Sequence, residues 1–186
     1  MLFRSDAVIM GEKMNHLNRV VEQILDFARN SEPRFQRVDI NALLDSLTLL
    51  TRHKFKQQRV QFERVAEPGV PVVSGDATQL EQAFLNLALN AAEAMPNGGS
   101  LTITTEAGQI GSNAAVAIEF KDTGLGMTAE QRERAFASLL KSTKASGNGI
   151  GLRVVKRVVE AHRGVFELES SLGRGTAVRI LLPAAE

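Results

Sequence analysis

Cysteine is absent from the 186 residues of this chain, and neither acidic nor basic side chains are in large excess. The absence of cysteine excludes disulfides and thiolate chemistry, and it fits a reducing compartment. With 22 basic and 21 acidic side chains, the net charge is +1. Binding that neutralises many nucleic-acid phosphates needs a basic face, so we expect no nucleic-acid partner.

Long apolar runs are also missing. No stretch of the chain approaches the ~18 apolar residues that a membrane-spanning helix needs, and the first residues, MLFRSDAVIMGEK, lack a signal-peptide pattern. We therefore expect a cytoplasmic location and no membrane contact from this chain, and leave open whether a longer parent protein is membrane-anchored. The length accommodates one packed domain of ~150 residues and one additional element.

The residues that are present are organised around a helix predicted over 79–96. Its apolar residues recur in steps of three and four; they are Leu80, Phe84, Leu87, Ala88, Ala91, Ala92 and Met95. Asp76 followed by Gln79 predicts the start, and the Pro-Asn-Gly-Gly turn after the helix predicts its end. Asn86 and Asn90 do not suit a buried helix, because asparagine is a poor helix former and the two lie one turn apart on one face.

Two glycine motifs follow this helix. The first is Asp122-Thr-Gly124-Leu-Gly126, and the second is Gly147-Asn-Gly149-Ile-Gly151-Leu152. The helix with two asparagines, then DxGxG, then GxGxGL resembles the catalytic ATP-binding domain of two-component sensor histidine kinases. That domain is a branch of the gyrase/chaperone/histidine kinase/MutL superfamily, and the resemblance runs from about residue 15 to residue 183.

The other elements follow from periodicity and turn residues. A helix begins at Asp39 or Asn41 and continues to Gln57, and further helices are predicted over 129–140 and 150–162. Strands are predicted around 60–63, 71–75, 101–105, 116–120, 165–169 and 176–182, with 108–113 as a hairpin loop. This order predicts an α+β fold, a two-layer α/β sandwich whose mixed, mostly antiparallel sheet has helices on one face. The resemblance implies the Bergerat-type ATP-binding fold.

The N-terminal part has a different pattern. Residues 8–28 carry a heptad seam of Met10, Met14, Leu17, Val21, Ile24 and Ala28, which favours packing against another helix and hence self-association. By resemblance, residues 1–30 are the second helix of the dimerisation hairpin, 31–38 a linker and 39–186 the catalytic domain. The first hairpin helix, with the phospho-accepting histidine, is not in this sequence, so we expect no autophosphorylation of the chain as given. The resemblance implies a homodimer through this hairpin in the full-length protein, and a response regulator as partner.

The residue types of the motifs suit a magnesium nucleotide. The Asp122 carboxylate can accept a hydrogen bond from the adenine amino group, whereas guanine presents a carbonyl there, so ATP is favoured. Gly124 and Gly126 remove side chains where the base approaches the backbone. The amide oxygen of Asn90 can bind Mg²⁺. The Gly147–Gly151 turn opens a helix whose free N–H groups favour phosphate.

The resemblance assigns further roles. It makes Asn90 the metal ligand, directs Asn86 toward the phosphates, and makes Lys144 a lid lysine that reaches the terminal phosphates, so Asn90 and Lys144 are the expected catalytic residues. The full set of expected contacts to ATP is Asn86, Asn90, Ala94, Asp122, Gly124, Gly126, Met127, Lys144, Gly147, Gly149, Ile150, Gly151, Leu152 and Thr176.

The sequence therefore predicts the ATP-binding portion of a protein-histidine kinase in a phosphorelay, which donates the γ-phosphoryl of Mg-ATP to a histidine outside this chain. One alternative is an ATPase of the same superfamily, but those enzymes carry a glutamate base at the position of Asn86, which cannot accept a proton. The other alternative is a degenerate nucleotide-binding regulatory module. It is favoured by the sequence after Phe136, which departs from the aromatic-rich family pattern, and by Asn148 in place of threonine.

Overall fold

The computed structural model describes residues 32–140 and 150–186, with side chains for 32–135 and 151–186. The heptad seam of residues 8–28 lies outside the described residues, as do Lys144, Gly147 and Gly149. Residues Pro33–Glu186 form one compact unit. Among the helices that the structure describes, none is long and apolar enough to cross a membrane.

A five-stranded sheet with the order β2-β4-β5-β7-β6 forms one layer of this unit. Its strands are β2 (Val60–Ala66), β4 (Gly99–Ile110), β5 (Asn113–Asp122), β6 (Val165–Ser170) and β7 (Thr176–Pro183). The β2–β4 pair is parallel, and the other neighbouring strands are antiparallel. The prediction of a mixed, mostly antiparallel sheet is confirmed.

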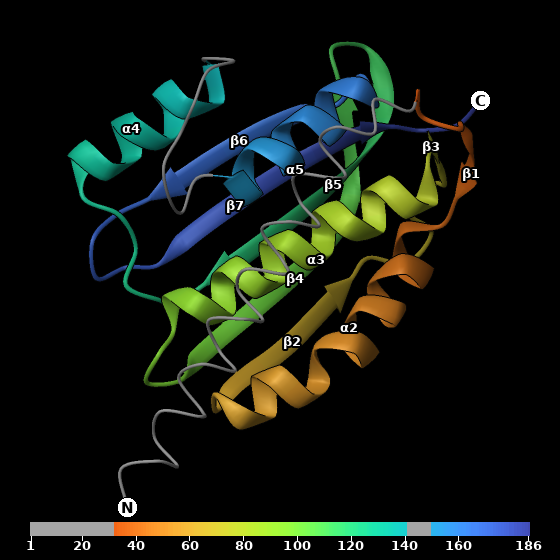
Figure 1. The fold of residues 1–186 in the computed structure, drawn as a ribbon. Coiled ribbons are helices and arrows are strands. Elements are labelled where there is room, and N and C mark those ends of the chain that lie inside the picture. The colour runs from red at the N-terminus through yellow and green to blue at the C-terminus, as the bar shows by residue number, and fades with distance from the viewer. Residues whose placement is uncertain (1–31, 141–149) are drawn as a thin grey trace, which may run out of the picture. The chain divides into compact units, whose positions relative to one another are not determined.

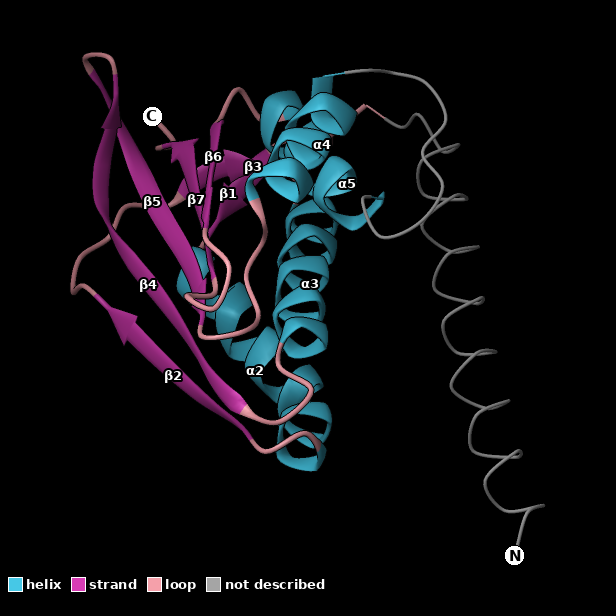
Figure 2. Cartoon of the chain, turned by 90° about the vertical axis from the view of Figure 1, so that its left-hand side faces the viewer, coloured by secondary structure: helices cyan, strands magenta, loops and turns pink. Residues whose placement is uncertain are grey.

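Helices form the second layer. Helices α2 (Ile40–Gln57), α3 (Ala77–Ala94) and α5 (Ile150–Ala161) lie on one face of the sheet, and α4 (Ala129–Leu140) lies beside α5 (Figures 1 and 2). The core between the layers is made of buried aliphatic and aromatic side chains, among them Leu47, Leu80, Phe84, Ile103, Ile118 and Ile180. The arrangement is the predicted two-layer sandwich, in which an antiparallel sheet keeps one face for the core and the other for water.

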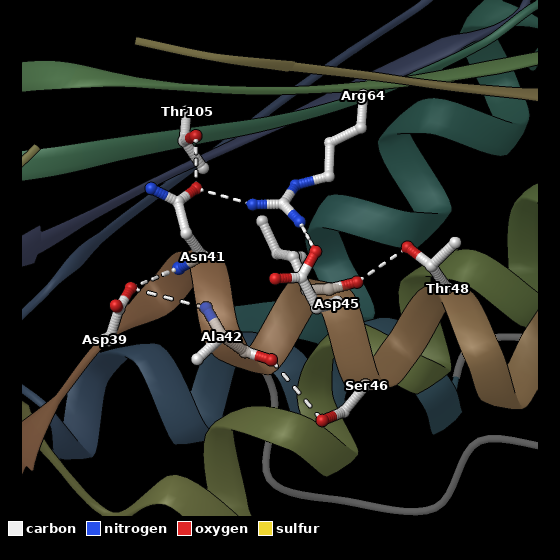
Figure 3. A network of polar contacts seen from close by, with 9 residues as sticks. Asp39, Asn41, Ala42, Asp45, Ser46, Thr48, Arg64 and Thr105 are labelled. Carbon is white, nitrogen blue, oxygen red and sulfur yellow. Dashed lines mark hydrogen bonds and ion pairs between the residues drawn. The ribbon is translucent and has the colours of Figure 1, made fainter. Parts of the chain in front are cut away.

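Aspartate side chains begin two of these helices. The Asp39 carboxylate accepts from the N–H groups of Asn41 and Ala42 at the start of α2 (Figure 3), so Asp39 is the cap and Asn41 lies in the first turn. Asp76 accepts from the N–H groups of Thr78 and Gln79, and α3 therefore begins two residues earlier than predicted. Each cap satisfies N–H groups that have no partner inside the helix.

Two segments differ from the expectation. Gln36–Val38, expected to be irregular linker, form the short strand β1, because they pair antiparallel with β3 (Val73–Gly75). The β4–β5 loop is also shorter than the predicted 108–113: the ladder continues to the pair Ile110–Asn113, so only Gly111 and Ser112 make the turn. Gly111 has φ +62°, which suits a two-residue hairpin turn.

Candidate functional site

A pocket of about 100 Å³ lies between α3, the end of β5 and the start of β7. Seven of the residues predicted from the sequence line it: Asn90, Ala94, Asp122, Gly126, Met127, Leu152 and Thr176. These residues come from five separate parts of the chain, between positions 90 and 176, and the fold brings them to one place. The pocket is thus the common location of the helix, the first glycine motif and Leu152 of the second.

The carboxylate of Asp122 is the buried polar group of this pocket. Asp122 is the last residue of β5, and its exposed fraction is 7%. Its Oδ1 accepts from the N–H of Gly124 at 2.8 Å and from the N–H of Thr176 at 3.2 Å. Burial raises the pKa of Asp122 from its ordinary value of 3.8, and the two N–H groups oppose that rise only in part. Within the described residues both hydrogen bonds fall on Oδ1, so Oδ2 can accept from a ligand.

The glycines of the DxGxG turn allow backbone to pack on backbone. A Cβ on Gly124 would lie 2.6 Å from the carbonyl oxygen of Ala94, and the next residue, Leu125, donates its N–H to that oxygen at 2.9 Å. Gly126 has φ +63°, and a Cβ there would lie 2.0 Å from the carbonyl oxygen of Ser171. The expected reason for these glycines was the approach of a base. In the structure, the close neighbours that require them belong to the protein itself.

Asn90 lies where α3 meets the beginning of α5. A Cβ on Gly151 would be 3.1 Å from Nδ2 of Asn90 and 3.2 Å from its Oδ1, so the absent side chain lets the first turn of α5 approach the amide. The N-terminal end of a helix carries positive partial charge and N–H groups that favour anions. Asn86, one turn earlier on α3, is 3% exposed and does not line the pocket within the described residues.

The donor set limits which metal could bind here. In residues 32–140 and 150–186 there is no group of three or more His, Cys, Asp or Glu side chains that could hold an ion. A cation at Asn90 would therefore take one protein oxygen and complete its shell with ligand oxygens and water. This composition fits Mg²⁺ bound together with phosphates, and it does not fit a structural zinc site.

The expected phosphate loop cannot be compared with the structure in full. Lys144, Gly147 and Gly149 lie outside the described residues, and Ile150 is described only as the first residue of α5.

The apolar walls of the pocket were not among the predicted site residues. They are Leu87, Ala91, Leu101, Phe120 and Val178, which periodicity assigns to the core. Two of them could have been found from the sequence. Ala91 lies three residues before the predicted Ala94, on the same face of α3. Val178 lies two residues after Thr176, on the same face of β7.

Comparisons with known proteins agree with this geometry. The family model described as "Histidine kinase-, DNA gyrase B-, and HSP90-like ATPase" matches residues 75–186. The sensor histidine kinase ZraS of Klebsiella oxytoca is 34% identical over 178 residues, which are 95% of this chain and 37% of that protein. The chain thus spans little more than a third of this relative.

Solved structures show the same fold. Full-length ShkA in complex with AMPPNP superposes with a TM-score of 0.76 at 27% identity, over 98% of this chain and 39% of that one. Histidine kinase ThkA in complex with the response regulator protein TrrA gives a TM-score of 0.74 at 21% identity, over 95% of this chain and 50% of that one.

Proposed function

Because the chain belongs to the family of histidine kinase-, DNA gyrase B- and HSP90-like ATPases, we propose that it is the ATP-binding catalytic portion of a sensor histidine kinase. It holds Mg-ATP and presents the γ-phosphoryl group to a histidine outside this chain. The observation that carries the proposal is the single pocket lined by a buried carboxylate, Asp122, and by the amide of Asn90. The structural likeness of the chain to a kinase solved with AMPPNP supports a nucleotide as the ligand.

Asp122 selects adenine in this proposal. The N–H groups of Gly124 and Thr176 hold Oδ1 and fix the carboxylate, and Oδ2 accepts from the adenine amino group. A guanine carbonyl at that point would face a carboxylate oxygen with no proton between them. When guanine occupies the site, the buried carboxylate of Asp122 stays unpaired. The free-energy cost of that unpaired group is what disfavours GTP relative to ATP.

Asn90 and the first turn of α5 serve the phosphates. The amide oxygen of Asn90 holds Mg²⁺, and the N–H groups at the start of α5 favour the phosphate oxygens. The cation, when bound, neutralises charge on those oxygens. From the sequence alone we add two further groups for the phosphates, the ammonium group of Lys144 and the N–H groups of the Gly147–Gly151 turn. Ala94, Gly126, Met127, Leu152 and Thr176 line the same pocket and stay in the proposal as contacts to ATP.

The neutral side chain of Asn86 favours transfer over hydrolysis. A superfamily ATPase needs a base to take the proton from the attacking water, and an amide cannot do so. Phosphoryl transfer to histidine depends on positioning and charge stabilisation because its transition state is loose. Asn86 therefore suits a kinase that keeps its phosphoryl group for a protein acceptor.

The partners are proposals from the same family. We infer a homodimer through residues 8–28 in the full-length protein and a cytoplasmic site of action. A response regulator is the downstream partner, supported by the complex of the structurally similar ThkA with the response regulator TrrA.

Two measurements test the proposal. The chain should bind Mg-AMPPNP in calorimetry, and bind the GTP analogue less tightly. Incubated with γ-labelled ATP, the chain alone should stay unlabelled, whereas a separate peptide that supplies the first hairpin helix and its histidine should acquire acid-labile label. Label on His16 would contradict the missing-acceptor argument. Binding without any transfer to the peptide would instead favour the regulatory module.

A further inference from the structure

Helices α3 and α5 lie side by side and antiparallel (Figure 1). The candidate site lies toward one end of this pair, where Asn90 and Leu152 line the pocket. At that end Gly151 lies against Asn90. At the other end, the last turn of α5 meets the beginning of α3 through His162. The proposed nucleotide site does not use this second junction.

His162 is buried there, with 1% of its surface exposed, and both ring nitrogens are engaged. Its Nδ1 lies 2.7 Å from the carbonyl oxygen of Val158, so Nδ1 carries the proton and donates. Nε2 is then an acceptor, and it accepts the backbone N–H of Asp76 at 2.9 Å. A Cβ on Gly75 would lie 2.9 Å from Cδ2 of the ring, which shows how closely the chain before α3 approaches.

Arg34 and Phe35, near the start of the compact unit, also contact this junction. Oδ2 of Asp76 accepts the N–H of Arg34 at 3.0 Å, while Oδ1 caps α3. The ring of Phe35 lies 5.5 Å from the ring of His162, tilted by 51°. Burial raises the pKa of Asp76, but the backbone N–H groups of Arg34, Gln79 and Thr78, together with His162, lower it below 3.8 overall.

The apolar contacts between the two helices constrain their relative offset through packing alone. Ala83, Val155 and Val159 are fully buried, and contacts of this kind are non-directional. A hydrogen bond is directional and weakens steeply with poor geometry. The His162–Asp76 bond therefore adds a directional constraint on the axial offset of α5 against α3.

This offset reaches the candidate site because helices are stiff. His162 and Gly151 are eleven residues apart, which is about 16 Å of α-helix. At the far end, a Cβ on Gly151 would already be 3.1 Å from the amide of Asn90. A slide of α5 would change the space between that amide and the N–H groups of the first turn.

We propose that His162 is a positioning residue for the triphosphate: through Asp76 it sets the separation between Asn90 and the N-terminal turn of α5. This inference rests on the proposed function. The adenine pocket is built mainly from α3 and the sheet, and of α5 it includes Leu152 alone among the described residues. The effect of His162 therefore falls on ligands with phosphates rather than on the base.

A matched pair of variants separates the hydrogen bond from the bulk of the side chain. His162→Phe keeps a buried ring against Phe35 but leaves the Asp76 N–H without an acceptor, whereas His162→Gln offers an amide oxygen to it. We expect His162→Phe to weaken Mg-AMPPNP binding about tenfold, the scale of a typical coupling between sites. Adenosine affinity should stay within about twofold. His162→Gln should restore most of the Mg-AMPPNP affinity, and thermal melting monitors the fold of each variant.

Equal weakening of both ligands in His162→Phe, or no weakening of Mg-AMPPNP, overturns the proposal. If the unmodified protein binds no Mg-AMPPNP, the proposed function fails instead. A measurement without nucleotide separates the two cases. The chain has no cysteine, so spin labels on Asn97→Cys and Glu160→Cys report the offset of α5 against α3. The distance distribution should shift or broaden in His162→Phe and not in His162→Gln, and an unchanged distribution in His162→Phe refutes the positioning role.

Discussion

The pocket at Asp122 and a second polar cluster beneath α2 both contain buried polar groups, yet the partners of those groups differ in kind. The Arg64 cluster consists of Asn41, Asp45, Arg64 and Thr105 (Figure 3). The guanidinium of Arg64 donates to Oδ1 of Asn41 at 2.7 Å and pairs with the Asp45 carboxylate, and Thr105 donates to the same Asn41 oxygen at 3.0 Å. All of these partners come from α2, β2 and β4.

Among the described residues, the side chain of Asp122 has backbone partners alone, and both act on one oxygen. The Asp122 carboxylate lines a pocket, whereas the side chains of the Arg64 cluster lie in the contact of α2 with β2 and β4. In the Arg64 cluster the charge is matched by a carboxylate of the same chain, whereas at Asp122 the proposed ligand supplies the matching donor. A buried polar side chain points to function when its partners in the fold leave it incomplete next to a cavity.

The largest effect should come from breaking the Arg64 cluster. Arg64→Leu keeps the apolar stem but removes two charge-assisted hydrogen bonds, and we expect the free energy of unfolding to fall by about 3 kcal/mol. Nucleotide affinity should not change, because no residue of the cluster lines the pocket. Urea denaturation and calorimetry measure the two quantities. Asp45→Asn is the control: its side chain is 75% exposed, so its effect on stability should be small.

The next effect concerns the pocket. Asp122→Asn keeps an oxygen for the N–H groups of Gly124 and Thr176, but it turns an amide N–H toward the adenine amino group. We expect ATP affinity to fall by about 2 kcal/mol, with the preference over GTP reduced. Thr105→Val is a matched control in the Arg64 cluster: it should cost about 1 kcal/mol of stability and no affinity. Unchanged affinity and unchanged base preference in Asp122→Asn would remove the adenine-reading role.

Asn90 tests the metal end of the same pocket. Asn90→Ala should abolish the magnesium dependence of ATP binding and lower the affinity for Mg-ATP about tenfold, while the fold persists because alanine favours helix. Asn90→Asp, which keeps an oxygen ligand, should retain a response to Mg²⁺. If the alanine variant binds Mg-ATP as tightly as the unmodified protein, Asn90 is not the ligand.

The smallest effect is on the pH dependence of stability. Burial raises the pKa of Asp122 in the folded protein, so its protonated form is favoured there. The stability it contributes is present below 3.8 and is lost as the pH rises through the raised folded pKa. Asp122→Asn should therefore gain stability relative to the unmodified protein above that pKa, and the gain should vanish in acid.

The contribution of Asp76 to stability should have the opposite pH dependence. Its pKa is lowered in the folded protein, so its contribution is present above 3.8 and is lost as the pH falls through the lowered folded pKa. Asp76→Asn should then lose stability at neutral pH and converge with the unmodified protein in acid. Urea denaturation as a function of pH measures both variants, and curves of the same sign would contradict the contrast between the two carboxylates.

The parts of the molecule that the sequence predicts are those whose causes are local. Helix α4 was predicted with its observed bounds, and Asp122 was placed at the end of a strand, because periodicity and turn residues act over a few positions. The site residues were grouped by the resemblance of three short motifs to one family, and seven of them line one pocket.

The other features of the structure depend on which faces of distant helices and strands pack against each other. His162 and Asp76 are 86 positions apart, and Thr105 and Asn41 are 64 apart, so no local pattern could pair them. Arg64 follows Val60 and Phe62 on the inward face of β2, where a charged residue is intelligible only once its partners on α2 are known. Strand β1 is likewise created by its pairing with β3.

The two-residue turn at Gly111 and Ser112 is connected to the distant pocket through the register of β4 and β5. From the pair Ile110–Asn113 at the turn, the β4–β5 ladder counts without interruption to the pair Leu101–Asp122 at the other end. Side chains alternate between the faces of a sheet, so a register slipped by one residue would turn Asp122 out of the pocket and bring Thr123 or Lys121 in. The surface turn and the strand end that carries Asp122 therefore share one register, and a one-residue slip of β5 against β4 would remove the carboxylate from the pocket.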